Sequence, residues 1–557
     1  MKSNYFFKHP SLSLWFKLAL LSIFVVLTNH GILLRIETIG INTALAAYAF
    51  LWLVCIAAVC LVSFTNKFFI RFFWGLIISL SAFCGDFFYR AIGYHMGIDD
   101  LELMWRVRGD ADMALDFYWP IFLESLGLTV LGFFAILLPL HDRYAIHTNR
   151  LKLGVATAPL LPIFLISYII YARGGEGTNG LPNQISPAAM AGFVSIYNVI
   201  FEREISRENV AMIPAAEKNP KHVVLIIDES IRADYLDINS EHGLITNLTN
   251  RDNIANFGYA ASASNCSDAT NLILRMGGTK DTMPTALNSN PSIWSYASTA
   301  GYETTYIDAQ TSNGDLHNFM TEEEKNEIDH FIQIDDDVEM HNKDFAAAQV
   351  IKDLLKNDHP QFIYFVKNGA HWPYEGKYPR ERSFYKPYME PNEAPGVNLE
   401  HMANSYKNTI HWTVGEFFSE FLSDLDLSEH VVIYTADHAQ NLNHKRQGGF
   451  MSHCSTYNEH PTEGLVPLLT ITDSPKYSQE LADAAKINFD KASHYNLFST
   501  LLLMFGYPEQ DVLPRYGESL MQSIDTKQEY LVVPLFVKFG RPLRWQAIPQ
   551  RDTISLH

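Results

Sequence analysis

Cysteine is scarce in this chain of 557 residues, which contains only five. Cys55, Cys60 and Cys84 lie within long apolar stretches, so Cys266 and Cys454 alone remain in the polar part. An extensive disulfide framework is therefore excluded. The two remaining cysteines can pair if the polar part is exported, but the sequence does not set the distance between them.

Positive charge is also in short supply. The chain has 42 Lys and Arg against 61 Asp and Glu, a net charge of −19, and most of the surplus lies beyond residue 172. Nucleic-acid partners require basic surfaces, so this balance argues against one. Internal repeats and low-complexity tracts are absent as well.

Long apolar runs are confined to the first 172 residues. Five of them approach the roughly 20 residues that a bilayer span requires. The first is too long for a signal peptide and lacks a small-residue cleavage site, so we expect it to remain as a span. The predicted spans are residues 12–34, 43–64, 68–91, 118–140 and 151–172.

Basic residues predict the orientation of these spans. They gather in alternate connections that would be cytoplasmic if the N-terminus lies inside, namely Lys2, Lys8, Lys67, Arg71, Arg143, Arg150 and Lys152. The opposite connection at residues 97–112 is acidic. Five spans that start inside leave the rest of the chain outside.

Residues 173–183 form a Gly-rich connection after the last span. Ser186 and Pro187 predict a helix start, and apolar residues recur on one face through residues 188–204. This helix is expected to lie against the membrane or the spans, with an ordinary packing helix as the alternative. The predicted domains are a transmembrane domain (1–172), a linker with a bridging helix (173–220) and a folded domain (221–557).

Beyond residue 221, short apolar runs alternate with helical patterns. The runs predict buried strands at residues 222–227, 304–307, 362–366, 431–435 and 466–472. Helical patterns occupy residues 344–355, 400–422 and 493–505. This alternation is typical of an α/β domain with a mainly parallel sheet flanked by helices.

Three of the predicted strands end in residues that bind metals. The first runs into Asp228 and Glu229, the third leads to His371, and the fourth stops at Asp437 and His438. Ligands of α/β sheets bind beyond the carboxyl ends of the strands, and carboxylates and imidazoles are zinc ligands. One polar strand end is common in any loop, but three in one sheet predict a metal site.

A nucleophile is expected in the small polar segment 261–271, which precedes an apolar run. A residue at a helix N-terminus meets free N–H groups and the positive end of the helix dipole, and both favour an incoming phosphate. Thr270, Ser267 and Cys266 are the candidates. In the alternative interpretation, Ser267, Asp268 or Thr270 only caps a helix.

Taken in order, these motifs resemble the lipid phosphoethanolamine transferases of Gram-negative envelopes, which belong to the alkaline phosphatase and sulfatase superfamily. The shared series is a strand ending in Glu, a Thr in a small polar loop, Gly-x-His-x-Pro, a strand ending in Asp-His, and a later His. The sequences of residues 405–422 and 493–506 also resemble segments of the family. The resemblance covers nearly the whole chain and implies a multi-pass protein of the bacterial inner membrane with an alkaline-phosphatase-like catalytic domain in the periplasm.

The resemblance also implies roles for single residues. Glu229, Thr270, Asp437 and His438 would hold zinc, and Thr270, four residues after Cys266, would also be the nucleophile. A bound cation lowers the pKa of a coordinated hydroxyl group, so this threonine would attack a phosphodiester near neutral pH.

His371 and His453 fall where the family keeps histidines that hold the phosphate or a second zinc. They would stabilise phosphoryl oxygens or exchange protons with the alcohols. The implied donor is phosphatidylethanolamine. Its phosphoethanolamine group would form a covalent phosphothreonine intermediate, and its lipid alcohol would leave as diacylglycerol. The implied acceptor is lipopolysaccharide, at lipid A or the core, or another envelope glycan.

Two departures from the family pattern stand out. The first strand ends in Asp228-Glu229 where the family has Gly-Glu, so Asp228 either competes as a ligand or faces the other side of the strand. The nucleophile segment lacks the second cysteine that relatives often carry. The choice between lipid A, a core sugar and another glycan as acceptor therefore stays open.

Several other functions remain as alternatives. A glycerol-phosphate transferase or a membrane-bound phosphodiesterase of the same superfamily would have a similar site. A true sulfatase is disfavoured because residues 266–270 lack the Pro and Arg of the Cys/Ser-x-Pro-x-Arg motif. A non-catalytic glycan-binding protein of the envelope is the alternative from another class, but it need not retain the complete set of site residues.

Overall fold

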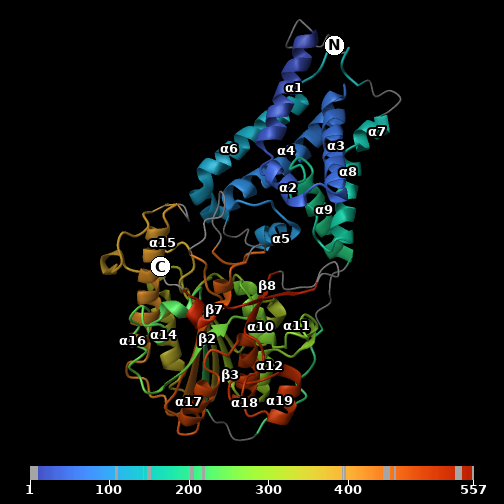
Figure 1. Ribbon diagram of the computed structural model, residues 1–557. Coiled ribbons are helices and arrows are strands. Elements are labelled where there is room, and N and C mark those ends of the chain that lie inside the picture. Colours follow the sequence, from blue (N-terminus) through green and yellow to red (C-terminus); the bar gives the residue numbers. More distant parts are fainter. Residues whose placement is uncertain are drawn as a thin grey trace. The chain divides into compact units, whose positions relative to one another are not determined.

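The computed structural model describes residues 10–106, 111–141, 143–146, 152–200, 206–215, 220–391, 393, 397–442, 452–456, 459–533 and 542–554. Within these ranges the chain forms two compact units that meet in sequence at residues 203 and 204 (Figure 1). The first unit is helical, and the second contains the sheet.

Four apolar segments of the first unit are long enough to cross a membrane: Thr43–Phe64, Phe68–Ile92, Phe117–Leu137 and Gly154–Ala172. The predicted first span is instead a bent pair of helices at 60°, and it supplies a fifth crossing if the pair acts as one span. Gly31, with φ +63°, lies between the two helices of this pair. The helices are α1 (Pro10–Leu27), α2 (Ile32–Ile39), α3 (Thr43–Phe64), α4 (Phe68–Ile92), α5 (Ile98–Arg106), α6 (Ala111–Leu137), α7 (Lys152–Thr157), α8 (Leu160–Ala172) and α9 (Ser186–Ile200).

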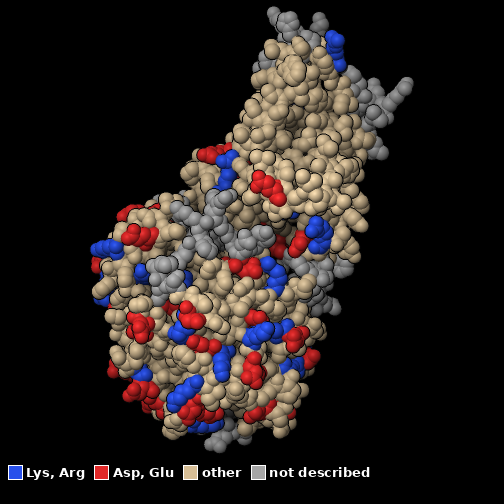
Figure 2. Space-filling model, in the orientation of Figure 1, with Lys and Arg blue, Asp and Glu red and all other residues tan. Residues whose placement is uncertain are grey.

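One buried carboxylate of the first unit has several polar partners. Asp86 on α4 is fully buried and lies 2.6 Å from His30, 3.0 Å from Arg90 and 2.6 Å from the hydroxyl of Ser125. The charges of intramembrane residues are expensive unless they find such partners. Much of the surface of this unit is bare of charge, whereas both signs are scattered over the second unit (Figure 2).

The second unit is built on a seven-stranded sheet in the order β2-β7-β6-β1-β5-β3-β4. β6, β1, β5, β3 and β4 run parallel, and β7 is antiparallel to both of its neighbours, so the predicted mainly parallel sheet is confirmed. All five predicted strands are present. The strands are β1 (His222–Asp228), β2 (Ile254–Ala261), β3 (Glu303–Asp308), β4 (His330–Gln333), β5 (Gln361–Val366), β6 (His430–Ala436) and β7 (Leu465–Ile471).

Helices flank this sheet (Figure 1). The three predicted helices are confirmed, although a π-helical turn at His411–Glu416 separates α15 from α16 within the second of them. The helices are α10 (Ser267–Met276), α11 (Thr285–Ser289), α12 (Ile293–Thr299), α13 (Glu322–Lys325), α14 (Lys343–Leu354), α15 (Leu399–Ile410), α16 (Phe417–Phe421), α17 (Tyr477–Ile487), α18 (Leu497–Met504) and α19 (Glu509–Tyr516).

The sequence patterns missed four strands. β2 contains Asn256 and Gly258, which are poor strand formers, and its register shifts at this point because Gly258 has φ +75°. β4 is a short edge strand. β8 (Glu529–Val532) and β9 (Arg544–Ala547) form a separate antiparallel hairpin.

Candidate metal site at the carboxyl ends of the strands

The polar strand ends noted in the sequence meet at one edge of the sheet. β6, β1, β5 and β3 are consecutive parallel strands, and Asp228 pairs with Ala436 while Ile227 pairs with Val366. The residues that follow these strands therefore emerge side by side. Their strands are buried on both faces, so the edge rests on a rigid core.

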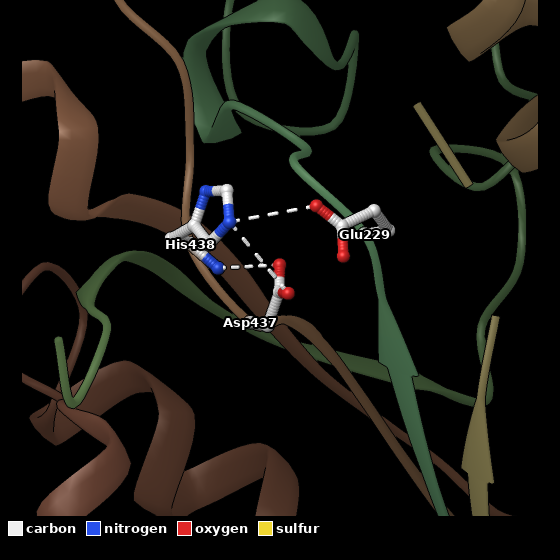
Figure 3. A group of neighbouring side chains, drawn as sticks. All are labelled: Glu229, Asp437 and His438. Atoms are coloured by element: carbon white, nitrogen blue, oxygen red, sulfur yellow. Dashed lines mark hydrogen bonds and ion pairs between the residues drawn. The ribbon is translucent and has the colours of Figure 1, made fainter. Parts of the chain in front are cut away.

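Glu229, Asp437 and His438 form the metal-type cluster of this edge (Figure 3). Each offers a ligand atom, and these atoms lie within 4.8 Å of one another. Nε2 of His438 is 3.4 Å from Oε1 of Glu229 and 3.7 Å from Oδ2 of Asp437. All three residues are buried. The structure thus brings together three of the four predicted ligands.

Hydrogen bonds orient these atoms toward one another. Nδ1 of His438 donates to the carbonyl of Ala439 at 3.0 Å, which leaves a lone pair on Nε2. Oδ1 of Asp437 accepts from the backbone of Ser230 at 3.0 Å and of His438 at 2.7 Å. Two carboxylates and an imidazole lone pair therefore converge, and this donor set fits zinc.

Burial and mutual proximity shift the pKa values of this cluster. Burial, reinforced by the charge of Glu229, raises the pKa of Asp437 well above its usual range. Burial also opposes ionisation of Glu229, but His438 and His371 lower the pKa of this carboxyl below its usual value. Burial lowers the pKa of His438. Two adjacent buried carboxyls are costly to ionise without a cation, so a metal would relieve their repulsion.

Glu229 has supporting partners that the sequence patterns missed. The hydroxyl of Ser230 donates to Oε1 at 2.6 Å. The amide of Gln310 donates to Oε2 at 3.1 Å and to the carbonyl of Lys367 at 2.8 Å. Gln310 follows β3 by two residues, so comparing the ends of all predicted strands would have found it.

Helix α10 presents a hydroxyl to the cluster, but not the expected one. Oγ of Ser267, the first residue of the helix, lies 3.0 Å from Nε2 of His438 and 3.4 Å from Oε2 of Glu229. Oγ1 of Thr270 is instead bonded to the backbone of Ser264. The hydroxyl that is hydrogen-bonded to the cluster is therefore that of Ser267, and the predicted fourth ligand, Thr270, lies one turn further along α10.

The loop before α10 is held by the C-terminal hairpin. The backbone N–H of Leu531 donates to the carbonyl of Ala263 at 2.9 Å, and Asn265 donates to the carbonyl of Leu531 at 3.2 Å. The N–H of Val533 donates to the side chain of Asn265 at 3.1 Å. Strand β8 thus supports the segment that leads into Ser267.

The two other predicted histidines lie beside the cluster. The ring of His453 stacks on His438 with centroids 4.3 Å apart, and His371 lies 5.8 Å from His453. A disulfide between Cys266 and Cys454 joins the start of α10 to the His453 segment. Burial, followed by the charges of the other two histidines, lowers the pKa of His453.

Asp228 faces away from the metal-type cluster. Its Oδ2 lies 2.6 Å from Nζ of Lys367 and accepts from the hydroxyl of Tyr434 at 3.0 Å. Its Oδ1 accepts from the backbone of Glu229 at 2.9 Å. Of the two alternatives left by the sequence, the structure favours the one in which Asp228 serves the opposite side of the strand.

Comparisons with known proteins agree with this geometry. The sulfatase family model matches residues 221–507. Kdo(2)-lipid A phosphoethanolamine 7''-transferase of Escherichia coli is 23% identical over 305 residues, covering 52% of each chain. The enzyme of the same name from Salmonella typhimurium is 25% identical over 306 residues, covering 51% of this chain and 52% of the relative. The chain thus spans about half the length of these curated relatives.

A solved structure extends the likeness to the first unit. Lipooligosaccharide phosphoethanolamine transferase A of Neisseria meningitidis, an integral membrane protein, has a TM-score of 0.62 at 17% identity. The match covers 90% of this chain and 97% of that protein, so the two share a fold. The resemblance to lipid phosphoethanolamine transferases that the motifs indicated is confirmed, and the chain belongs to the sulfatase family.

Proposed function

We propose that this protein is a membrane-anchored, zinc-dependent phosphoethanolamine transferase. It takes phosphoethanolamine from phosphatidylethanolamine and transfers it to lipopolysaccharide, at lipid A or the core, or to another envelope glycan. The observation that carries this proposal is the convergence of Glu229, Asp437 and His438 on a hydroxyl at the start of α10. The names of the curated relatives support the choice of transferred group and acceptor.

In this proposal, the residues of the cluster, the N-terminus of α10 and two histidines have separate roles in the reaction. Glu229, Asp437 and His438 would hold the zinc, which would supply Lewis-acid chemistry by lowering the pKa of a neighbouring hydroxyl and stabilising negative charge on the phosphoryl group. The N-terminus of α10 faces the negative charge of the substrate phosphate. His371 and His453 contact the phosphoryl oxygens and exchange protons with the leaving and entering alcohols.

The first unit supports a lipid donor. Phosphatidylethanolamine presents its head group at the bilayer surface, and an anchored enzyme meets it at a raised effective concentration. By this proposal the spans belong to the bacterial inner membrane, and the second unit lies in the periplasm.

Transfer of a labelled head group tests the proposal. The full chain in detergent is loaded with zinc and mixed with phosphatidylethanolamine labelled in its ethanolamine, together with lipopolysaccharide. We expect label on the acceptor and release of diacylglycerol. Glu229→Gln should lower the rate by at least about 100-fold, since removing one group that stabilises the transition state costs about that much. His330→Ala, an exposed histidine paired with Glu303, is the matched control and should keep the wild-type rate.

The alternatives predict different labels. Activity with phosphatidylglycerol in place of phosphatidylethanolamine would indicate a glycerol-phosphate transferase. Release of labelled phosphoethanolamine to water, with none on the acceptor, would indicate a phosphodiesterase. If the protein binds lipopolysaccharide but consumes neither phosphatidylethanolamine nor phosphatidylglycerol, the result would indicate a non-catalytic glycan-binding protein.

A further inference from the structure

We propose that Ser267, and not Thr270, is the nucleophile. This inference rests on the proposed function, since it names the atom that would carry the phosphoethanolamine. It differs from the family pattern, which points to the threonine four residues after Cys266. The two hydroxyls lie one helical turn apart on α10, so their surroundings decide between them.

Thr270 is committed to the protein backbone. Its Oγ1 accepts from the N–H of Ser264 at 3.0 Å and donates to the carbonyl of the same residue at 3.1 Å. The side chain is fully buried. Because the donor and an acceptor position of this hydroxyl are both used within one loop, attack on a phosphate would require the loop to open. The structure assigns Thr270 to anchoring the segment before α10.

Ser267 is placed at the cluster itself. The ligands of a tetrahedral zinc lie about 2.0–2.1 Å from the metal, so neighbouring ligand atoms are roughly 3.3 Å apart. Oγ of Ser267 is 3.0 Å from Nε2 of His438 and 3.4 Å from Oε2 of Glu229. Ser267 therefore adds a hydroxyl oxygen whose distances to His438 and Glu229 are close to the spacing in a tetrahedral zinc site, next to the three side chains that Figure 3 shows.

Its position on the helix favours the same role. Ser267 is the first residue of α10, a helix of ten residues, and Cys266 provides no side-chain cap there. The helix end therefore directs its positive dipole toward the cluster and toward any phosphate bound against Ser267. Thr270 lies one turn inside the helix, so the helix dipole would stabilise a phosphate bound there less.

The step is an exchange of esters. A bond forms between Oγ of Ser267 and the phosphorus of phosphatidylethanolamine, and the bond from phosphorus to the glycerol oxygen breaks. The bonding electron pair stays on that oxygen, which takes up a proton as diacylglycerol leaves. The proton of Ser267 is lost to water. The product is an ester of phosphoethanolamine with Ser267, and no oxidant or reductant is consumed.

Peptide mass spectrometry locates this ester. The zinc-loaded full chain is incubated with phosphatidylethanolamine vesicles and no acceptor, quenched in acid, reduced and digested with trypsin. Residues 252–275 fall in one peptide, so fragmentation between Ser267 and Thr270 is needed to place the adduct. We expect it on Ser267, absent from Ser267→Ala and present in Thr270→Val. Turnover of Ser267→Ala should fall at least about 10³-fold, as losses of nucleophiles do.

Zinc binding gives a second measurement that does not depend on turnover. A chelator dye competing for zinc should remove the metal more readily from Ser267→Ala than from Thr270→Val, because alanine removes an atom beside His438 and Glu229, whereas valine removes only the loop contacts to Ser264. Ser267→Thr, which keeps a hydroxyl, should restore both zinc retention and adduct in part. An adduct on Thr270, or an adduct that survives Ser267→Ala, would overturn the inference.

A chromogenic diester separates this inference from the proposed function. Bis(p-nitrophenyl) phosphate needs no lipid site, and attack by Ser267 releases p-nitrophenolate. If phosphatidylethanolamine yields no adduct while this diester yields a Ser267-dependent burst, the donor is wrong and the nucleophile stands. A burst that depends on Thr270 instead would contradict the nucleophile alone.

Discussion

Asp228 and Glu229 are adjacent, buried and chemically alike, yet they serve opposite sides of one strand. Side chains of consecutive strand residues alternate in direction, so one carboxylate reaches the metal-type cluster and the other reaches Lys367. Lys367 also contacts the carbonyl of Thr413 and lies 3.8 Å from Asp344. Gly369 leaves room for this pair, since a Cβ there would lie 2.3 Å from Oδ1 of Asp228.

Removing the lysine should cost much stability. Lys367→Met leaves Asp228 and Asp344 buried without their cation, and breaking a buried pair costs about 3–5 kcal/mol. Asp228→Asn together with Lys367→Met should recover a large part of this loss. Urea unfolding of the full chain in detergent, followed by tryptophan fluorescence, measures the difference.

An exposed pair on the same unit is the control. Lys356 and Asp353 lie 2.7 Å apart, with both side chains more than half exposed. Lys356→Met should leave the free energy of unfolding almost unchanged, because exposed ion pairs are screened by solvent and contribute little. Equal changes in the free energy of unfolding for the two lysine variants would show that the buried Asp228 pair stabilises the fold no more than an exposed pair.

His494 should make stability depend on pH. It is fully buried, its Nδ1 accepts from the backbone of Ala263 at 3.1 Å, and its Nε2 lies 2.8 Å from the hydroxyl of Thr435. Burial lowers the pKa of His494 to about 3. Between that value and about 6.5 the unfolded chain binds a proton that the folded chain does not, so stability is lost as pH falls below about 6.5.

The expected loss at pH 5.0 relative to pH 7.5 is about 2 kcal/mol from this residue, at roughly 1.4 kcal/mol per pH unit. Unfolding titrations at the two pH values should show it in wild type. His494→Gln, which cannot titrate, should show a pH effect smaller by that amount. An unchanged pH effect in the variant would mean that His494 is protonated in the folded state.

At the scale of elements, the sequence predicted the strands better than the starts of helices. Five buried strands could be predicted because their apolar residues form unbroken runs. The metal site could be predicted from the polar residues that directly follow three of these strands. β2 was missed because Asn256 and Gly258 interrupt its run. The antiparallel direction of β7 depends on pairing partners distant in sequence, which no local pattern reports.

The start of α10 shows why the site could be predicted only in part. Ser267, Asp268 and Thr270 are all residues that favour the first turn of a helix, so composition does not choose among them. Counting from Cys266 favoured Thr270. The hydrogen bonds between Ser264 and Thr270 favour Ser267, and the bonds from β8 to the loop are tertiary contacts; no pattern of residue types reports either.

The disulfide next to this helix should matter more for activity than for folding. It joins residues 188 positions apart and ties the start of α10 to the His453 segment. Replacing Cys266 and Cys454 by alanine should cost about 2–4 kcal/mol in stability. The rate of head-group transfer by the still-folded variant should also fall, because the covalent link is lost and hydrogen bonds such as the one from the N–H of residue 454 to the carbonyl of Asn265 alone tie the His453 segment to the loop before α10.

Assays below the unfolding midpoint of the double variant measure this effect. Cys84→Ala, which removes a free cysteine of the first unit, is the control and should leave transfer unchanged. Transfer at the wild-type rate in the folded double variant would show that the disulfide only stabilises the fold.

At the scale of the whole molecule, the two units should respond differently to removal of metal. The metal-type cluster belongs to the second unit, where Asp437 and Glu229 would regain their repulsion. Restoring zinc at 100 times its dissociation constant should stabilise that unit by about 2.7 kcal/mol. Hydrogen exchange should show chelator-dependent loss of protection after β1 and β6, with α3 and α4 unaffected. Equal loss in both units would contradict this assignment.

The support that β8 gives to the loop before α10 has a consequence for biosynthesis. If the second unit is exported as proposed, a chain made from its N-terminus would insert its apolar helices first and would export Glu229 and Ser267 well before Leu531. The loop that presents Ser267 gains its last backbone partners only when the end of the chain arrives. Under the proposed function, we therefore expect chains that end before Leu531 to consume no lipid.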